Sequence, residues 1–417
     1  AELKEIHEIS ETWLKHKKAH RYAEIQGYKS AEEAVRRFRE TRQQRKIQRQ
    51  QESKARAAAK ADRVEKWRQT NVAFLGDGVS GSLGQHQSQP ERLKAAGLPL
   101  LSTPNDVAEA LHIDIPELRW LAFHTEAART SHYTQFSIPK RSGGTRLISA
   151  PKPKTARAQR WILNNIVKRL PVEPPAHGFV SNRSIVTNAK AHIGQKLVFN
   201  VDLEAFFPTI TFCRVRGLLQ SIGYAPSVST VLALLCTECP RTRLQYGDDV
   251  YFAAVGERAL PQGACTSPAL SNAIARRLDR RLMGLCKKAS WRYTRYADDL
   301  TFSSNAPETL AGVWASIRHI IKDEGFRINR KKVRIQRSGR CQKVTGIVVN
   351  DKLGLPRTEV RRLRAIIHNA ENSGLASQNR DSDPKFEARL EGQLAYLAMV
   401  DPGKGLALMK KFRALPR

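Results

Sequence analysis

The pattern of apolar and polar positions divides the 417-residue chain into segments with different expected structures. Residues 1–73 carry few large apolar side chains among many Lys, Arg, Glu, Gln and Ala, which predicts one or more long, exposed basic helices. Residues 74–93 are rich in Gly, Ser and Gln and predict a linker. Strand-like and helix-like spacings alternate from about 133 to 350, and apolar stripes of mostly helical spacing follow from about 352 to 417. A chain of this length is expected to contain two or three domains.

Two segments of the alternating region combine apolar runs with carboxylates. The apolar run 197–201 is typical of a buried strand, and Asp202 ends it. Residues 291–303 predict a hairpin that contains Asp298 and Asp299. This pair has two interpretations, because adjacent Asp residues occur at solvated turns and also bind divalent metal ions. Asp202 supports the metal interpretation, since a charge at the end of a buried strand requires compensation.

The charge balance of the chain indicates the class of its partner. There are 71 Lys and Arg against 39 Asp and Glu, so the formal net charge is +32. This excess indicates a polyanion, of which nucleic acid is the commonest and an anionic membrane surface is the alternative. No apolar run reaches the length of about 18 residues that a transmembrane helix needs, so no membrane partner is predicted.

The cysteines indicate a location. The N-terminus has no apolar signal-peptide core, and the six cysteines predict reduced thiols in a cytoplasmic protein. Cys236 and Cys239 form a Cys-x-x-Cys pair, which would need a second pair of ligands to bind zinc. No second pair is evident and the motif ends an apolar run, so core packing is favoured over a zinc site.

Five motifs resemble those of reverse transcriptases and occur in the order typical of that family. The segment 296–299 (YADD) resembles the YxDD box, 259–272 (ALPQGACTSPALSN) resembles the Pro-Gln-Gly box, and 200–210 (NVDLEAFFPTI) resembles the strand of the first catalytic carboxylate. The segment 143–151 (GGTRLISAP) resembles the fingers hairpin, and 177–184 (HGFVSNRS) resembles the template-contacting segment.

Two further motifs narrow the resemblance to bacterial retron reverse transcriptases. The segment 188–192 (NAKAH) fits their NAxxH motif, and 344–346 (VTG) fits their VTG motif. The sequence departs from the family at Cys265, where Pro is frequent, and in its long basic arm, residues 1–73. The arm is interpreted either as a solvated helix or as an RNA-binding or partner-docking element.

The resemblance implies an α/β (α+β) fold with the right-hand architecture of polymerases. It would combine fingers, a ferredoxin-like palm and a helical thumb with a basic helical N-terminal extension. The expected boundaries are 1–73 for the extension, 74–93 for the linker, 94–195 for the fingers and N-terminal helices, 196–350 for the palm, and 351–417 for the thumb.

The resemblance also implies roles for individual residues. The expected catalytic residues are Asp202, Asp298 and Asp299, which with the backbone of Leu203 would bind two Mg²⁺ ions, Mn²⁺ being an alternative. The expected nucleotide-binding residues are Lys140, Arg146, Phe207 and Gln262. The expected RNA-binding residues are Asn188, His192, Val344, Thr345, Gly346, Arg361, Arg362, Arg364, Lys410 and Lys411.

Several of these roles have plain alternatives. Phe207 lies five residues after Asp202 and would be either an aromatic gate against a 2′-hydroxyl or a core residue. Arg146 and Lys140 would either grip the triphosphate or be ordinary exposed cations. His192 would either contact RNA or be a buried, hydrogen-bonded histidine.

The implied activity is that of a retron RNA-directed DNA polymerase. It would copy part of a structured non-coding RNA into multicopy single-stranded DNA, primed from a 2′-hydroxyl of that RNA. The expected partners are this RNA, its DNA copy, deoxynucleoside triphosphates and a separate effector protein, in a system for defence against phage. The alternatives are another bacterial reverse transcriptase, such as an intron maturase, a diversity-generating or a CRISPR-linked enzyme, and a non-enzymatic RNA-binding protein with a polymerase-like core.

Overall fold

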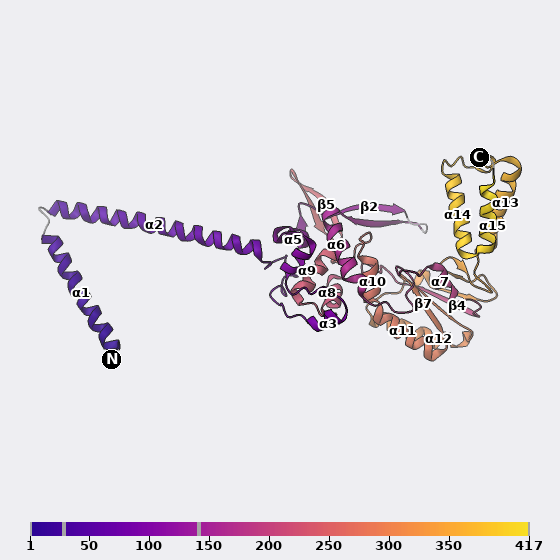
Figure 1. Cartoon of the computed structure of the whole chain (residues 1–417), viewed down its shortest axis with the longest axis horizontal. Helices are drawn as coiled ribbons and strands as arrows, with labels where there is room; N and C mark the ends of the chain where they lie inside the picture. The colour runs from indigo at the N-terminus through magenta and orange to yellow at the C-terminus, as the bar shows by residue number, and fades with distance from the viewer. Residues whose placement is uncertain (1, 27–30, 140–142, 416–417) are drawn as a thin grey trace. The chain divides into compact units, whose positions relative to one another are not determined.

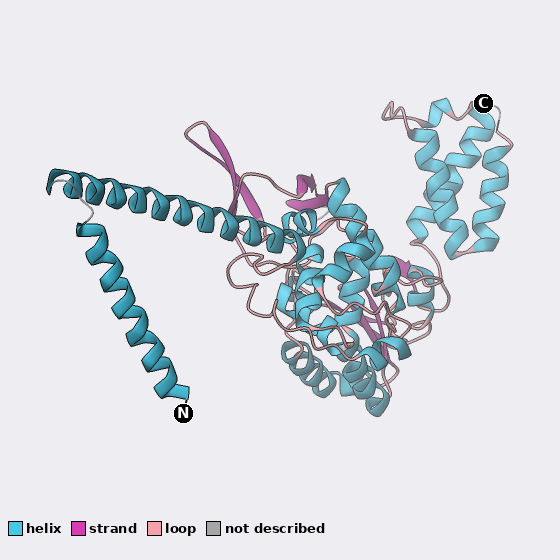
Figure 2. Ribbon diagram, turned by 60° about the vertical axis from the view of Figure 1, so that its left-hand side comes forward, coloured by secondary structure: helices cyan, strands magenta, loops and turns pink. Residues whose placement is uncertain are grey.

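Figures 1 and 2 show the computed structural model of the chain, which describes residues 2–26, 31–139 and 143–415. The chain divides into two compact units, residues 1–71 and 72–417. The first is helical, and the second combines helices with several small antiparallel sheets. The predicted α+β class is therefore confirmed.

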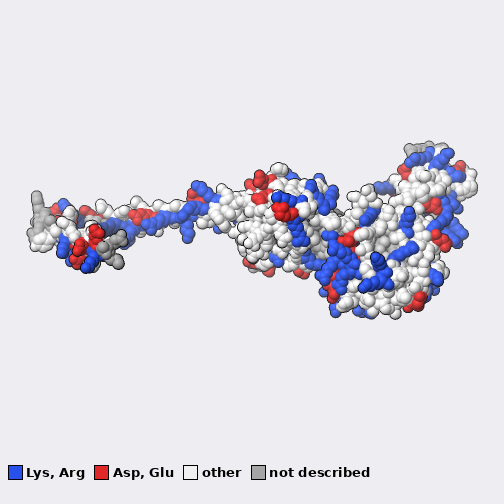
Figure 3. All heavy atoms as spheres, turned by 60° about the horizontal axis from the view of Figure 1, so that its bottom comes forward, with Lys and Arg blue, Asp and Glu red and all other residues white. Residues whose placement is uncertain are grey.

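Within its described residues, the first unit consists of the helices α1 (Glu2–Gln26) and α2 (Ala31–Thr70). Good helix formers fill α2, and no Gly or Pro interrupts it. Large apolar side chains such as Trp13 and Phe38 remain exposed. Lys and Arg side chains run along this unit, as Figure 3 shows. The predicted basic helical extension is confirmed, and a helix that is polar on all sides buries no core of its own.

The second unit is built around a four-stranded antiparallel sheet. Its strands are, in sheet order, β7 (Arg292–Tyr296), β8 (Asp299–Ser304), β4 (Leu197–Asp202) and β9 (Arg334–Arg337). Helices separate β4 from β7 and β8 from β9, so the connection is β-α-β-β-α-β, and the strands numbered along the chain have the sheet order 2-3-1-4. The ferredoxin-like sheet implied by the resemblance is therefore present.

Side chains alternate between the two faces of a sheet along each strand. In this sheet the apolar side chains of the strands gather on one face. Phe199 of β4 and Phe302 of β8 are buried in the main hydrophobic core. The same core contains apolar residues of α11 (Arg276–Ala289) and α12 (Leu310–Asp323), which lie side by side next to the sheet (Figure 1). These two helices therefore cover the apolar face.

The opposite face is polar where β4 and β8 meet. Asn200 donates from Nδ2 to Oγ1 of Thr301 on the neighbouring strand at 3.0 Å. Asp202 and Asp299 are direct neighbours in the β4–β8 register. Residues two apart on a strand share a face, so the polar pair and the two carboxylates lie on the same side.

Most of the remaining helices complete the main core. They are α3 (Pro90–Ala95), α4 (Pro104–Leu111), α5 (Ile115–Ala122), α6 (Pro153–Asn165), α8 (Phe212–Ser221), α9 (Pro226–Cys236) and α10 (Ser267–Ile274). The helix α7 (Ile185–Lys190) instead packs in the second core, described below. Short 3₁₀ turns lie at Val167–Arg169, Pro307–Thr309, Arg330–Lys332 and Ala376–Gln378.

Two further small sheets lie outside the central sheet. A hairpin joins β2 (Tyr133–Pro139) to β3 (Thr145–Pro151). A three-stranded sheet has the order β1 (Ala127–Ala128), β6 (Asp249–Ala254) and β5 (Arg241–Tyr246). Cys236 is the last residue of α9 and Cys239 lies between α9 and β5, and both side chains are buried, so the pair packs in the core as predicted.

The C-terminal helices form a second hydrophobic core. They are α13 (Arg357–Ser373), α14 (Phe386–Val400) and α15 (Pro402–Arg413). None of the helices described for this chain is long and apolar enough to cross a membrane.

A short hairpin connects the sheet to these helices. Its strands are β10 (Lys343–Val344) and β11 (Ile347–Val348). The turn residues Thr345 and Gly346 have φ values of 47° and 86°, as a type I′ turn requires. Val198 of β4 belongs to the second core, whereas its neighbour Phe199 belongs to the first. One strand therefore contributes to both cores.

Candidate active site

Three carboxylates gather where β4 and β8 meet. Asp202 is the last residue of β4, Asp299 is the first of β8, and the two are register partners. Asp298 precedes Asp299, and its carbonyl oxygen accepts a hydrogen bond from the Leu203 N–H at 2.9 Å. Backbone hydrogen bonds therefore fix the spacing between the two segments. The three predicted catalytic residues lie together at one end of the inner strands β4 and β8. This region is called the carboxylate edge below.

The Asp pair lies on a hairpin turn, but its side chains are not fully solvated. β7 ends at Tyr296 and β8 begins at Asp299, so Ala297 and Asp298 form the turn, and Ala297 has a φ of 56°. Asp298 and Asp299 are only partly accessible. The hairpin interpretation therefore describes the backbone, while the side chains lack the exposure of an ordinary solvated turn.

Burial and mutual repulsion make these carboxylates difficult to ionise together. Burial, followed by the charge of Asp202, raises the pKa of Asp298. Burial, followed by the charges of Asp298 and Asp202, raises the pKa of Asp299 to about 7. Nζ of Lys332 lies 2.9 Å from Oδ2 of Asp202 and supplies a compensating positive charge.

The donor chemistry of this edge fits a hard divalent cation. Mg²⁺ and Mn²⁺ prefer carboxylate oxygens, and a cation relieves repulsion between neighbouring carboxylates. Across the part of the chain that the structure describes, no group of three or more His, Cys, Asp or Glu has a metal-binding arrangement. One oxygen of Asp202 is directed at the ammonium group of Lys332 instead. The residues that could hold a cation here are Asp202, Asp298 and Asp299.

A fully buried arginine stabilises this turn. Arg295 of β7 makes a two-pronged ion pair with Asp279 of α11, with Nε–Oδ1 at 2.8 Å and Nη2–Oδ2 at 2.6 Å, and neither side chain is exposed. Nη1 of Arg295 also donates to the Ala297 carbonyl oxygen at 3.1 Å and to Oδ1 of Asn272 at 3.0 Å. The hydroxyl of Tyr293 donates to Asp279 at 2.8 Å. A buried ion pair is tolerated when its charges are hydrogen-bonded in this way.

The segment before α7 packs against the same turn. The Pro175 carbonyl oxygen accepts from the Arg295 N–H, and the Arg295 carbonyl oxygen accepts from the His177 N–H, each at 2.7 Å. A Cβ atom on Gly178 would lie 2.5 Å from the Ala297 nitrogen. Only glycine permits this approach, so the turn is fixed from a second side.

The predicted nucleotide-binding residues lie on several elements. Arg146 is exposed on β3, and its charge is among those that lower the pKa of Asp298, so it acts on the carboxylate edge. Gln262 is held against the same strand, because its carbonyl oxygen accepts from the Ser149 N–H at 2.7 Å. Lys140 lies outside the described residues.

Phe207 lies in the loop after β4 and is partly buried. Its ring centroid is 5.7 Å from that of Phe206 and 6.2 Å from that of Phe179. Phe206 is buried in the main core, whereas Phe179 is exposed. Phe207 therefore contacts the core and keeps part of its ring accessible.

Three of the predicted RNA-binding residues are buried. Asn188, His192 and Val344 each have 0% exposure. The His192 ring is hydrogen-bonded through Nδ1 to the Ser303 hydroxyl at 2.7 Å and through Nε2 to the Thr294 hydroxyl at 2.8 Å. The prediction that these side chains contact RNA directly does not agree with their burial. His192 instead links the end of α7 to two strands of the central sheet.

The other predicted RNA-binding residues are accessible. Thr345 and Gly346 form the β10–β11 turn, and the Thr345 hydroxyl donates to the Ile185 carbonyl oxygen of α7 at 3.3 Å. The basic residues of α13 and α15 are all exposed, namely Arg361, Arg362, Arg364, Lys410 and Lys411. Lys411 pairs with Glu371 at 3.0 Å, and the charges of the other four residues are available to phosphate groups.

Sequence reasoning missed two features of this site. Asp279 shares the apolar stripe of α11 with the buried residues Leu282 and Cys286, three and seven positions later. A carboxylate on such a stripe indicates a buried cation, and this signal could have identified Arg295. Lys332 lies in a run of several cations, and nothing in the sequence distinguishes it.

Comparison with known proteins shows which family and which relatives this chain is similar to. A family model described as reverse transcriptase (RNA-dependent DNA polymerase) matches residues 138–369, which contain all three carboxylates. The retron Mx162 reverse transcriptase of Myxococcus xanthus is 41% identical over 386 residues, covering 87% of this chain and 79% of that protein. The retron Mx65 reverse transcriptase of the same organism is 45% identical over 320 residues, with 77% and 73% covered. The retron Ec86 reverse transcriptase of Escherichia coli is 34% identical over 280 residues, with 66% and 81% covered.

Arg295→Gln should lower the free energy of unfolding by about 3–5 kcal/mol, because it leaves Asp279 buried without its cation. Urea unfolding measures this loss. The double variant Arg295→Gln/Asp279→Asn should recover part of it, since both charges are then absent. As a control, Arg277→Gln removes a 77% exposed partner of Glu324 and should cost less than about 1 kcal/mol. Equal losses for the two single variants would contradict the role of Arg295.

His192 should make stability depend on pH. Burial, followed by the charge of Arg292, lowers its pKa from 6.5 to about 3. Between these values the unfolded chain binds more protons than the folded one, so stability falls as pH decreases through this window. From pH 6.5 to 4.5 the fall attributable to one such group is about 2–3 kcal/mol.

The comparison that isolates this effect is His192→Gln, which does not titrate. Its unfolding free energy, measured in urea at each pH, should fall less steeply than that of the wild type. Parallel pH curves for wild type and His192→Gln would show that the histidine is not held neutral.

Proposed function

We propose that this chain, an RNA-directed DNA polymerase that belongs to the bacterial retron reverse transcriptases, copies part of a structured non-coding RNA into multicopy single-stranded DNA. Synthesis would begin at the 2′-hydroxyl of a guanosine in the same RNA. The observation that carries the proposal is the pairing of Asp202 with Asp299 across β4 and β8, beside Asp298 in the turn. Carboxylates so arranged suit phosphoryl transfer assisted by divalent ions.

The relatives favour a retron enzyme over other bacterial reverse transcriptases. Those named above are retron enzymes, at 34% to 45% identity. The alternative of a non-enzymatic RNA-binding protein is set aside, because the chain belongs to a polymerase family and has all three carboxylates.

The right-hand fold suggests how the parts of the chain divide the work. Residues 94–195 would act as fingers, 196–350 as the palm and 351–417 as the thumb. The palm would then contain the central sheet and its carboxylates, and the thumb would contain the three C-terminal helices. Residues 74–93, predicted as a linker after the basic extension 1–73, would instead belong to this enzyme core, because Leu75, Val79 and Leu83 are buried in the main hydrophobic core.

The carboxylate edge would hold two Mg²⁺ ions, or Mn²⁺ in their place. Asp202 and Asp298 would hold the ions, Asp299 would support the site, and the Leu203 carbonyl would add a ligand. When bound, the ions would activate the primer hydroxyl and neutralise charge on the triphosphate. Lys332 would exchange its contact with Asp202 for solvent or phosphate, since its side chain is half exposed.

The residues around this edge would bind the incoming nucleotide. Arg146 and Lys140 would hold the triphosphate through charge-assisted hydrogen bonds. Phe207 would lie beneath the sugar and exclude a 2′-hydroxyl through the accessible part of its ring. Gln262 would contact the nucleotide or the template, from a loop held against β3.

The exposed cations of α13 and α15 would bind the RNA and its DNA copy through phosphates, and unpaired bases and RNA shape would supply selectivity. Asn188 and Val344 would act indirectly, by fixing the turn at Thr345 and Gly346. His192 would act indirectly too, by holding the end of α7 against β7 and β8. A separate effector protein and a role in defence against phage complete the proposal.

The metal assignment predicts that Asp202→Asn or Asp298→Asn reduces primer extension by roughly 100-fold or more, because each change removes an anionic oxygen at constant size. Extension in MgCl₂ measures activity, and a gel shift should show that RNA binding persists. Glu204→Gln is the control, because Glu204 is exposed two residues after Asp202. Wild-type extension by either Asp variant would overturn the assignment.

The gate assignment predicts that Phe207→Ala lowers discrimination against ribonucleotides by roughly tenfold or more. The ratio of kcat/KM for a deoxynucleotide to that for the matching ribonucleotide measures this effect. Phe179→Ala removes the neighbouring exposed ring and should leave the ratio unchanged. If Phe207→Ala stays active with its discrimination intact, Phe207 does not contact the sugar.

The priming mechanism predicts that DNA copurified with the full-length protein is joined at its 5′ end to a guanosine 2′-hydroxyl. Ribonuclease digestion should leave a branched nucleotide that mass spectrometry identifies. DNA that begins at the 3′ end of an annealed primer would contradict this mechanism.

The same product tests the thumb. Arg361→Gln with Arg364→Gln should reduce self-primed synthesis more than extension of a generic annealed primer at matched salt. Lys287→Gln with Lys288→Gln removes equal charge from exposed positions of α11 and should affect both reactions little. Equal losses on both templates would assign the two arginines to general phosphate binding alone.

A further inference from the structure

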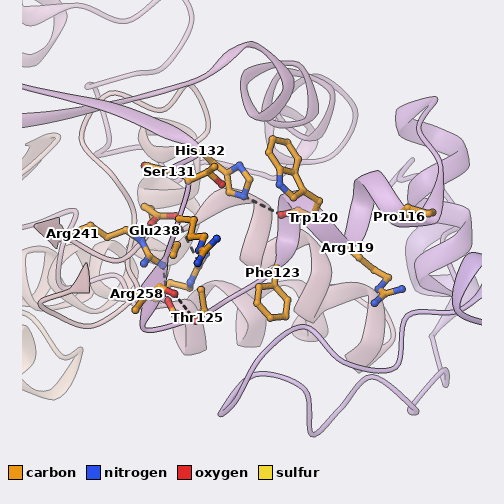
Figure 4. Close-up of a pocket in the computed structure, with 14 residues that line it drawn as sticks. Pro116, Arg119, Trp120, Phe123, Thr125, Ser131, His132, Glu238, Arg241 and Arg258 are labelled. Atoms are coloured by element: carbon orange, nitrogen blue, oxygen red, sulfur yellow. Dashed lines mark hydrogen bonds and ion pairs between the residues drawn. The ribbon is translucent and has the colours of Figure 1, made fainter. Parts of the chain in front are cut away.

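A cavity of about 530 Å³ lies away from the residues assigned above. Figure 4 shows it between α5, the segment 125–132 and residues that follow α9. None of the proposed catalytic, nucleotide-binding or RNA-binding residues lines it. Its volume falls in the range of roughly 300–1,000 Å³ that is common for small-molecule sites.

Aromatic rings form one wall of the cavity. Trp120, at the end of α5, is 47% exposed, and Phe123 just after the helix is 42% exposed. The His132 ring stands perpendicular to Trp120, with centroids 4.4 Å apart. Nε2 of His132 donates to the Trp120 carbonyl oxygen at 3.0 Å, which leaves Nδ1 as an acceptor. Exposed rings beside hydrogen-bonding groups are the usual platform for a nucleobase.

Cations outnumber anions in the opposite wall. The Glu238 carboxylate lies 2.8 Å from Nε of Arg241 and 3.7 Å from Nη2 of Arg258, and all three side chains are less than 10% exposed. Nη1 of Arg258 donates to two backbone carbonyl oxygens, but its buried Nε has no hydrogen-bond partner among the described residues. The exposed residue Arg129 also lines the cavity and pairs with Asp249 at 3.0 Å. This wall therefore carries excess positive charge.

The positive charge acts on the neighbouring histidine. Burial, followed by the charges of Arg258 and Arg241, lowers the pKa of His124. An anion in the cavity would offset this potential, whereas a cation would add to it. The chemistry of the lining thus selects a ligand that is both aromatic and anionic.

We propose that this cavity binds a phosphorylated nucleoside. The base would stack on Trp120 and Phe123, and the phosphate would lie toward Arg129 and Arg258. The ligand is either a free nucleotide or an unpaired nucleotide of an RNA strand, since both present the same base and phosphate. The site is separate from the carboxylate edge and does not depend on the polymerase mechanism.

The test uses the full-length protein in EDTA, with 2-aminopurine riboside 5′-monophosphate as a fluorescent probe that is quenched by stacking. Trp120→Ala should weaken its binding about tenfold, the loss expected for one stacking contact. Arg129→Gln should weaken it by a similar factor through the phosphate. Trp120→Phe should retain most of the affinity, which separates stacking from a folding defect.

Matched controls remove similar groups elsewhere. Trp67→Ala deletes a tryptophan of 51% exposure in α2, and Arg243→Gln deletes an exposed arginine of β5. Both variants should bind the mononucleotide like the wild type.

A second arm uses a single-stranded pentaribonucleotide with 2-aminopurine at its centre. Mononucleotide binding that is sensitive to Trp120→Ala and Arg129→Gln supports the proposal with a free nucleotide as ligand. The same sensitivity for the pentanucleotide alone supports it with RNA as the source. Absence of binding, binding insensitive to both variants, or equal competition by inorganic phosphate would overturn the proposal.

Discussion

The buried ion pair between Arg295 and Asp279 holds the part of the chain on which the site depends. Its guanidinium reaches the carbonyl oxygen of Ala297, a residue in the left-handed region, which costs roughly 1–2 kcal/mol for a non-glycine residue. Gly178 closes the other side of the same turn. Contacts with Arg295 and Gly178 thus hold the strained turn in place. The turn can therefore carry adjacent carboxylates that repel one another.

The charges of the protein act differently at long and at short distances. The chain as a whole carries a formal net charge of +32, which draws nucleic acid and nucleotides toward it over distances comparable with the Debye length. The carboxylate edge is locally anionic and would repel the same phosphates without a bridging cation. Lys332 partly compensates the edge through Asp202. The attraction of phosphates at long range and their repulsion at short range therefore arise from separate groups.

Much of this arrangement follows from the sequence, and the rest depends on tertiary packing. The apolar run 197–201 and the YADD hairpin predict the two strands that meet, because both signals are local in the chain. The partner of Arg295 lies on another element, so its ion pair has no local signature. The NAxxH motif locates His192 but does not indicate which way the ring points, and burial between two hydroxyls excludes the predicted direct RNA contact. Lys140 lies outside the described residues.

Strand β4 contributes Phe199 to one hydrophobic core and Val198 to the other. Loss of packing in either core would expose a side chain of β4. The other core requires the same strand. Residues 72–417 are therefore expected to melt in a single cooperative transition, in which the C-terminal helices and the central sheet unfold together. A fragment that ends before the β10–β11 hairpin would leave Val198 uncovered, and its exposed strand face would favour aggregation over independent folding.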